Sequence, residues 1–534
     1  MPLFDTLDAS LVDSPFRGPK FVPLSSLKTI ITKASVEQEL SPITRLRNPQ
    51  LSRNIVKNAR KVFSILVFID KASAIKELYR DGLTDDQLPL SSRKDDAGRI
   101  TPFADHGKKT FASFGSWKTV SIKSFLDKQW LLLSPVFDKT GRHFDLNPAC
   151  ALPMFQETLE VATGPYNAVH QGWIHPAHQR VSKVSDVLLL RGGGTALIEL
   201  LTNQHCGENG LRVALKEFRG EFNIAKSNFE KEWENLSHIQ QHNHPHLIKH
   251  IATWQAGNKF FVMFEWADGG SLWDFWEREK PGAPSQEVVL WSLRQIRGLV
   301  SALEALHSLN CRHGDLKPEN ILHFRDRGEK PESSSGRGIL VMADVGVSRV
   351  HKQMTHLRTG PTTTRATTIS YQAPETDTDP LVARSRAYDA WSIGCILLEH
   401  IVWLLYGPQG IEGFRKRRES KAFDGTYRSA NFYSLTISHL ERRAEIHHAV
   451  EDAMDALQRD PRCQAGTALG DLLKLIREGL LKIDPQDRFT APEIQDVVER
   501  IVRDARPDSL YLLNTSNRPS PVPSIFRYVS PPVS

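Results

Sequence analysis

The sequence contains little of what marks several large classes of protein. Cysteine is scarce, with five among 534 residues and no CxxC pair, which excludes a disulfide framework and a zinc ribbon. The charge excess is small, because 68 Lys and Arg stand against 62 Asp and Glu. This balance does not favour a nucleic-acid-binding or polybasic membrane protein. The cysteine usage predicts a reducing compartment, cytoplasmic or nuclear.

A signal peptide and a long hydrophobic run are also missing. Residues 1–18 lack the basic start and apolar core of a secretory leader. The most apolar stretch, residues 393–406, is too short to cross a bilayer and carries Glu399 and His400. We therefore expect a buried core helix there and no membrane span.

Three parts of the chain differ in texture. Residues 1–150 form an N-terminal extension of unknown role, predicted to be mainly helical from the periodicity of residues 61–90. Residues 151–505 alternate strand-like and helical runs and hold every motif described below. Residues 506–534 are rich in Pro and Ser and are predicted to be a disordered tail.

Within the middle part, strand-like runs precede the long helices. Strands are predicted at residues 212–218 and 259–266, with a helix at 229–239 between them. A long helix is predicted at 285–307, and a capping box at Thr490 begins a last helix. This order predicts an α+β fold in which a small β-rich part is followed by a helical one.

The sharpest motif is HGDLKPENIL at residues 313–322. A carboxylate, a lysine two residues on and an asparagine five residues on suit phosphoryl transfer. Asp315 would accept the proton of the acceptor hydroxyl, and Lys317 would neutralise charge on the phosphoryl group. The amide oxygen of Asn320 would hold a metal ion.

Two further motifs supply groups for the same chemistry. Asp344 follows the apolar run 339–342, and a carboxylate at a strand end suits Mg²⁺. Lys216 ends the apolar run 213–216 and can reach phosphates if an acid orients it. Glu232, on the helix that follows, is that acid.

The remaining motifs concern architecture. Glu375 ends an Ala-Pro-Glu triplet, Asp389 begins the stretch DAWSIG, and Arg488 lies late in the chain. A buried Glu375 needs a partner, and Arg488 can pair with it through two hydrogen bonds.

Together these motifs resemble the eukaryotic protein kinase family over about residues 155–505. The resemblance implies a two-lobed fold, with a small β-rich N-lobe at 151–266 and a larger helical C-lobe at 267–505. It implies ATP, Mg²⁺ and a protein substrate, with no nucleic acid. Lys317, and Thr368 in the substrate-docking segment, match the serine/threonine type. Stretches such as GWIHPAHQ and LLEHIVWLLYG resemble poorly characterised kinases of filamentous fungi.

The resemblance also implies site roles. Lys216 would bind phosphates and pair with Glu232, Asp315 would be the base, and Asn320 and Asp344 would bind Mg²⁺. The implied ATP-binding residues are Gly164, Val169, Ala214, Lys216, Phe264, Glu265, Ala267 and Leu322.

The phosphate-binding glycine loop departs from the family pattern. Residues 192–196 and 164–169 are both candidates, and we favour the second. Val169 then lies 216 − 169 = 47 residues before Lys216, where the family usually has about fifteen to twenty-five. Val181-Ser182 can be encoded by a 5′ splice signal, and Leu201-Thr202-Asn203 by a branch-point signal. We therefore hypothesise that residues 181–204 are a retained intron.

Gly314, Val345 and Thr367 also replace residues common in the family. Two alternatives to an active protein kinase therefore stay open. One is a pseudokinase that acts as a scaffold or nucleotide-binding switch. The other is a small-molecule kinase of the aminoglycoside or choline type, although Glu375, Asp389 and Arg488 argue against it.

Overall fold

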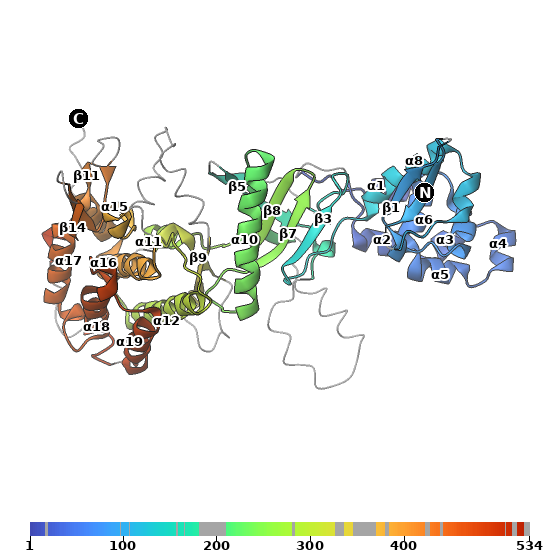
Figure 1. Ribbon diagram of the computed structural model, residues 1–534. Coiled ribbons are helices and arrows are strands. Elements are labelled where there is room, and N and C mark those ends of the chain that lie inside the picture. The colour runs from blue at the N-terminus through green and yellow to red at the C-terminus, as the bar shows by residue number, and fades with distance from the viewer. Residues whose placement is uncertain are drawn as a thin grey trace, which may run out of the picture. The chain divides into compact units, whose positions relative to one another are not determined.

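The computed structural model describes residues 1–534 except 16–19, 97, 106, 156–158, 165, 181–209, 280–283, 326–335, 345–369, 380–383, 422–427, 438–441, 508, 515–520 and 528–534. The chain forms two compact units. The first comprises Met1–Phe229 and His250–Trp266, and the second comprises Glu230–Lys249 and Ala267–Ser534. In Figure 1 the first unit runs from blue to green and the second from green to red.

The first 132 residues of the first unit have a core of their own. Helix α6 is its centre, because every residue from Val62 to Phe68 is buried. A two-stranded hairpin, β1 (Leu90–Lys94) with β2 (Ile100–Ala104), packs in the same part. The helices of this part are α1 (Leu3–Ala9), α2 (Leu24–Ile30), α3 (Lys33–Glu39), α4 (Pro42–Arg47), α5 (Leu51–Asn58), α6 (Arg60–Phe68), α7 (Ile75–Arg80) and α8 (Thr119–Lys128).

The helical prediction for residues 61–90 is confirmed only as far as Arg80. Beyond it the chain makes a short 3-10 turn at Asp85–Gln87 and enters β1 at Leu90. The carboxylate of Asp85 accepts hydrogen bonds from the backbone N–H groups of Lys61 and Val62 in the first turn of α6. This contact caps the N-terminus of α6 and ties the segment around Asp85 to it, so that this segment does not continue as a helix.

A six-stranded sheet forms the rest of the first unit, in the order β3-β7-β8-β6-β5-β4. All neighbours are antiparallel except β3 and β7, which are parallel. The predicted strands at 212–218 and 259–266 are found as β6 and β8. The strand bounds are β3 (Arg142–Leu146), β4 (Leu159–Thr163), β5 (Asn167–Ile174), β6 (Leu211–Phe218), β7 (His250–Ala256) and β8 (Lys259–Glu265).

One face of this sheet is covered by residues from the segments just before and just after β3. Phe137, Leu152 and Met154 join one apolar cluster with β6 and β8 side chains such as Leu215 and Met263. Phe137 is fully buried. The sheet and its core therefore reach back into the range 1–150, which the sequence analysis treated as a separate extension.

The second unit is mainly helical. Helix α10 begins at Phe222, seven residues before the predicted start, and α12 begins after its N-cap Ser285 as predicted. The predicted capping box at Thr490 begins α19. The helices are α10 (Phe222–His242, with its first turns in the first unit), α11 (Leu272–Arg278), α12 (Gln286–Ser308), α15 (Glu375–Thr378), α16 (Ala387–Arg418), α17 (His448–Arg459), α18 (Ala468–Leu475) and α19 (Ala491–Asp504).

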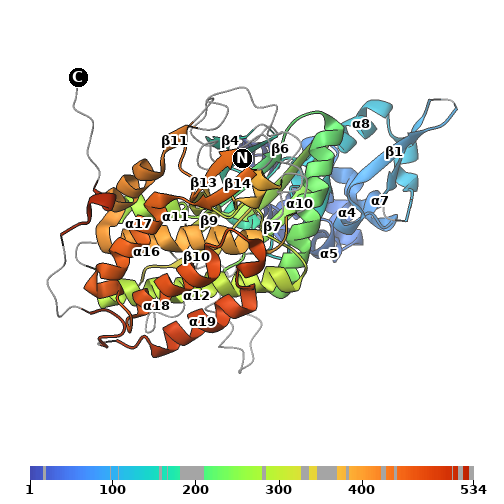
Figure 2. The ribbon, with the colours of Figure 1, turned by 60° about the vertical axis from the view of Figure 1, so that its left-hand side comes forward.

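Short two-stranded ribbons complete this unit, and α12 and α19 run side by side (Figure 2). The ribbons pair β9 (Ile321–Phe324) with β10 (Ile339–Met342), β11 (Ser420–Lys421) with β12 (Arg428–Ser429), and β13 (Tyr433–Ile437) with β14 (Arg442–Ile446).

Helix α16 forms the centre of the second unit. Trp391 and Trp403, both at most 1% exposed, lie on it. Among the described residues it is the one helix long and apolar enough to cross a membrane, but 94% of its most apolar window is buried inside the fold. A membrane span is therefore not indicated, in agreement with the predicted core helix.

The prediction of a disordered tail over residues 506–534 is wrong for several described residues. Leu512, Leu513 and Phe526 are all at most 1% exposed and belong to the core of the second unit. The ring of Phe526 stacks on Tyr406 at a centroid distance of 4.7 Å. The prediction rested on the high Pro and Ser content, which does not show where single apolar side chains pack. Burial of these side chains stabilises the docked tail.

Candidate active site

Asp315, Lys317 and Asn320 lie together on the loop between α12 and β9. The ammonium group of Lys317 donates a hydrogen bond to Asp315 Oδ2 at 3.0 Å. The amide nitrogen of Asn320 donates to the backbone oxygen of Asp315 at 2.8 Å and to its Oδ2 at 3.1 Å. The Asp315 side chain is 29% exposed, so the oriented carboxylate stays accessible.

Burial and neighbouring charges shift the pKa values of two side chains on this loop, Lys317 and Glu319. Burial alone would lower the pKa of Lys317, but the nearby Asp315, Glu319 and Asp344 outweigh it and raise that pKa. Lys317 therefore carries its positive charge at neutral pH. Burial also raises the pKa of Glu319, whose Oε2 atom has no hydrogen-bond partner among the described residues.

The β9–β10 ribbon places Asp344 close to Asn320. Met342, at the end of β10, is paired with Ile321, at the start of β9. The next residue, Ala343, donates its N–H to the backbone oxygen of Asn320 at 2.8 Å. The sequence analysis recognised the strand before Asp344 but missed β9, so it gave no reason for this proximity.

The buried carboxylate of Asp389 binds the backbone just before Asp315. Asp389, which is fully buried, accepts hydrogen bonds at 2.8 Å from the backbone N–H groups of His313 and Gly314 and pairs with His307 Nε2 at 2.9 Å. His313 in turn donates from Nε2 to the oxygen of Ala343 at 2.9 Å. The chain at Gly314 has a φ of +76°, a conformation that favours glycine.

The second architectural contact joins Glu375 to Arg488. Arg488 donates to the two carboxylate oxygens of Glu375 at 2.9 and 2.8 Å, which is the bidentate pair expected from the sequence. The same guanidinium donates to backbone oxygens of Lys482, Ile483 and Ala387. A fully satisfied Arg488 therefore fastens α15 to the start of α16 and to the segment before α19.

In the first unit, several of the predicted ATP-binding residues share one face of the sheet. The register pairs Val169 with Lys216, and Ala214 with Phe264. Directly paired residues point to the same face, and alternate residues of β6 do likewise. This face is opposite to the one covered by Phe137. Gly164 lies in the turn between β4 and β5, where its N–H donates to the oxygen of Asn167 at 2.8 Å.

Other residues that were predicted to act together belong to different units. Lys216 and Glu232 are both buried, but Lys216 belongs to the first unit and Glu232 to the second. Ala267 and Leu322 also belong to the second unit. The Lys216–Glu232 pair and the complete ATP site therefore stay predictions.

Several sequence-based predictions fall outside the described residues. These are Thr368, Val345, the alternative glycine loop at 192–196 and the hypothesised intron at 181–204. The structure also adds a contact that the sequence analysis missed, because Lys139 forms an ion pair with Glu265. Lys139 lies in the segment before β3, so this segment binds a residue predicted to contact the nucleotide.

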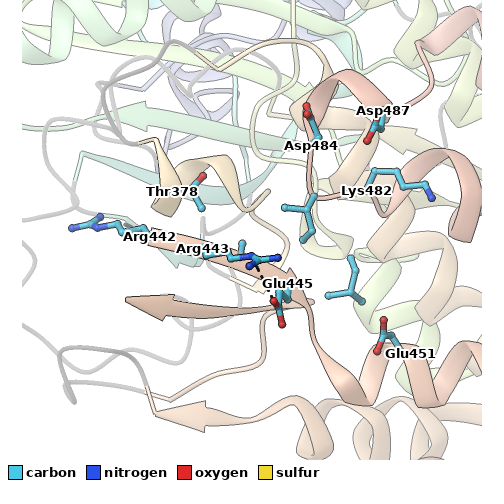
Figure 3. Close-up of a pocket in the computed structure, with 11 residues that line it drawn as sticks. Thr378, Arg442, Arg443, Glu445, Glu451, Lys482, Asp484 and Asp487 are labelled. Atoms are coloured by element: carbon cyan, nitrogen blue, oxygen red, sulfur yellow. Dashed lines mark ion pairs between the residues drawn. The ribbon is translucent and has the colours of Figure 1, made fainter. Parts of the chain in front are cut away.

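A separate hollow of about 700 Å³ lies in the second unit. Figure 3 shows Arg442 and Arg443 on β14, with Asp484 and Asp487 across the hollow. Ala444, Ile446 and Ile483 also line it. None of the residues predicted to take part in phosphoryl transfer lines it.

Comparison with known proteins identifies the family. The model of the protein kinase domain matches residues 198–498, which is more than half of the chain. The chain therefore belongs to the protein kinase domain family. The match includes residues 313–322, Asp344 and the Glu375–Arg488 pair.

Curated relatives agree with this assignment. A putative cyclin-dependent kinase F-2 of Oryza sativa is 29% identical over 39% of this chain and 58% of its own length. A calcium/calmodulin-dependent protein kinase of Metarhizium anisopliae is 29% identical over 38% of this chain and 47% of its own length. The serine/threonine-protein kinase PKH3 of Eremothecium gossypii is 28% identical over 38% of this chain and 25% of its own length.

The family match and the names of these relatives support the predicted enzyme class, a protein serine/threonine kinase. The matches cover less than two thirds of the length of each of these relatives.

Proposed function

We propose that the chain is an active ATP- and Mg²⁺-dependent kinase that transfers the γ-phosphoryl group to a serine or threonine hydroxyl of a protein. The observation that carries this proposal is the position of Asp315, whose carboxylate is oriented by Lys317 and Asn320 and remains partly exposed. Positioned groups and fixed charges account for most of the catalysis in phosphoryl transfer.

Each residue of the loop has a part in this reaction. Asp315 accepts the proton of the attacking hydroxyl and directs its oxygen toward the phosphorus atom. Lys317, held cationic by its acidic neighbours, stabilises negative charge on the transferred group. Asp389 keeps the backbone of residues 313–314 in place, so that Asp315 needs no rearrangement before the reaction.

The residues present fit a magnesium ion. Asn320 uses its amide nitrogen for Asp315, which leaves its amide oxygen as a ligand, and Asp344 supplies a carboxylate nearby. Mg²⁺ prefers one or two such oxygen ligands together with phosphate oxygens. When bound, the ion would neutralise charge on the phosphates.

The nucleotide would lie against the sheet face that carries Val169, Ala214, Lys216 and Phe264. This proposal treats the sheet as the N-lobe and the helical unit as the C-lobe of a two-lobed kinase, within the range 151–505. The likeness to kinases of filamentous fungi and a cytoplasmic or nuclear location belong to the same proposal.

A pseudokinase is the second candidate. The turn between β4 and β5 carries a single glycine, Gly164, where the family pattern has several. Weak phosphate binding there would leave a folded protein that acts as a scaffold or nucleotide-binding switch and transfers no phosphoryl group.

The test is phosphoryl transfer from labelled ATP with Mg²⁺ to a generic basic protein. We expect transfer by the wild-type chain, or by a form without residues 181–204, and its loss in Asp315→Asn. The matched control is Asp496→Asn, because Asp496 is an exposed residue of α19. If both forms fold and bind ATP but transfer nothing, the pseudokinase replaces the proposal.

A further inference from the structure

Helix α4 exposes apolar side chains that nothing in the fold covers. None of its residues is buried, and Ile43 and Leu46 are 63% and 82% exposed. Residues three apart lie on the same side of a helix, so the two side chains project together. The helix begins with an ordered cap, since Ser41 Oγ accepts a hydrogen bond from the N–H of Thr44 at 3.2 Å. The apolar pair is therefore presented by a regular helix.

Positive charges lie close to this pair in the sequence. Residues 40–69 contain no Asp or Glu. Arg45 and Arg47 of α4, and Arg53 and Lys57 of α5, are all exposed, and none has an ion pair among the described residues. Arg53 and Lys57 are four residues apart and so share one face of α5, away from its buried Leu51 and Ile55.

Of the two acids that precede this stretch on α3, only Glu39 is exposed, so it offsets at most one of the four positive charges. Glu37 of α3 is already bound, because it accepts a hydrogen bond from Ser52 at 2.9 Å and pairs with Lys33 at 3.6 Å. Only residues 48–50 separate α4 from α5, so the four cations and the two apolar side chains lie on two consecutive short helices. We call these six residues the basic helical surface. The small net charge of the whole chain gives no sign of this local group of cations.

We propose that the basic helical surface binds the surface of an anionic lipid bilayer. Ile43 and Leu46 would enter the boundary between headgroups and acyl chains, and the four cations would meet anionic headgroups. A bilayer offers an apolar layer beneath a negative one, which matches both halves of the surface. A nucleic acid or an acidic peptide would match its charge but would leave the aliphatic pair in water.

This binding is peripheral and needs no spanning helix. It is independent of the proposed kinase activity, since none of the six residues belongs to the catalytic loop. If both hold, the surface would concentrate the enzyme near protein substrates at an anionic membrane.

The test is sedimentation of the full chain with vesicles of phosphatidylcholine alone or with 30% phosphatidylserine. We expect binding to the anionic vesicles only, weakened as NaCl is raised, because salt screens exposed charges. Removing each cation should weaken binding about fivefold, the equivalent of about 1 kcal/mol. The double variant Ile43→Ser/Leu46→Ser should weaken it about tenfold or more.

Matched controls come from other exposed positions of the same unit. Val120→Ser removes an apolar side chain that is 72% exposed on α8, and Arg93→Gln removes an exposed cation of β1. Neither should change vesicle binding. Circular dichroism checks that all variants remain folded.

Three results would overturn the proposal. One is equal binding to neutral and anionic vesicles. Another is undiminished binding by the Ile43→Ser/Leu46→Ser variant, which would leave charge as the sole attraction. The third is tighter binding to duplex DNA or to polyglutamate than to the anionic vesicles, which would assign the surface to another class of partner.

Discussion

Asp389 Oδ1 accepts a hydrogen bond from the backbone N–H of Gly314 at 2.8 Å, although 75 residues separate the two in sequence. The other carboxylate oxygen binds His313 N–H and His307. A single buried charge on α16 thus holds the backbone immediately before Asp315.

Asp389→Asn should destabilise the second unit by about 2 kcal/mol, because an amide nitrogen would face a backbone donor in a buried site. Thermal unfolding measures the loss, with Asp496→Asn as the exposed control. A variant as stable as the control would show that the loop does not depend on this charge.

Gly314→Ala should cost about 1–2 kcal/mol, since a side chain at a φ of +76° strains the backbone. The control is Gly115→Ala, where an added Cβ would meet nothing within 4 Å. Urea unfolding of the two variants gives the difference. Equal stability would mean that the left-handed conformation at residue 314 is easily relaxed.

Asn320→Ala should reduce phosphoryl transfer about 10–100-fold and raise the Mg²⁺ concentration needed for half-maximal rate. The variant loses one proposed metal ligand and both hydrogen bonds to Asp315. Titration of the rate with Mg²⁺ measures the effect, with Asn58→Ala as an exposed control. An unchanged Mg²⁺ dependence would remove Asn320 from the metal site.

His178 should make the junction between α2 and the sheet sensitive to acid. Its Nε2 accepts the N–H of Leu24 at 3.2 Å, and its Nδ1 donates to the oxygen of Pro135 at 3.0 Å. Burial lowers the pKa of His178 to about 4, from an ordinary value of 6.5. Between these two values the unfolded state binds a proton that the folded state does not.

The contribution of neutral His178 to the free energy of unfolding is therefore fully present above pH 6.5. It falls by about 3 kcal/mol as the pH approaches 4. Hydrogen exchange at the Leu24 N–H, corrected for its intrinsic rate, should show falling protection over this range. The N–H of Leu66 in α6 is the control. Protection at Leu24 that does not change relative to Leu66 would contradict the prediction.

Phe526→Ala should destabilise the second unit by about 3 kcal/mol, the usual cost of emptying a buried aromatic site. A Cβ at Gly413 would lie 2.6 Å from the oxygen of Phe526, so α16 is shaped to receive the tail. Val522→Ala, at a 40% exposed position, is the control. If thermal unfolding of the two variants is the same, the tail undocks before the unit unfolds.

Local sequence signals predicted local structure well. Ser285 begins α12 and Thr490 begins α19 because capping satisfies N–H groups within one turn of the chain. The apolar runs at β6 and β8 are equally local. The grouping of Asp315, Lys317 and Asn320 also follows from a span of six residues on one loop.

Contacts between distant segments had no such signal. Nothing local shows that Phe137 fills the core beneath the sheet, or that β3 pairs with β7. The same holds for Phe526 on α16, since its Pro- and Ser-rich surroundings suggest disorder. Burial depends on which surfaces meet, and composition does not contain that information.

The sequence by itself determined the family, the residues proposed for catalysis and the identity of the Glu375–Arg488 pair, because each rests on residue types at short or characteristic spacings. Only the tertiary structure decided what orients those groups. Asp389 reaches the catalytic loop, and the β9–β10 ribbon brings Asp344 to Asn320, through packing and strand register. The structure likewise decided which charges stay unpaired at the surface, since a charge is cancelled by its neighbours in space and not by the total of the chain.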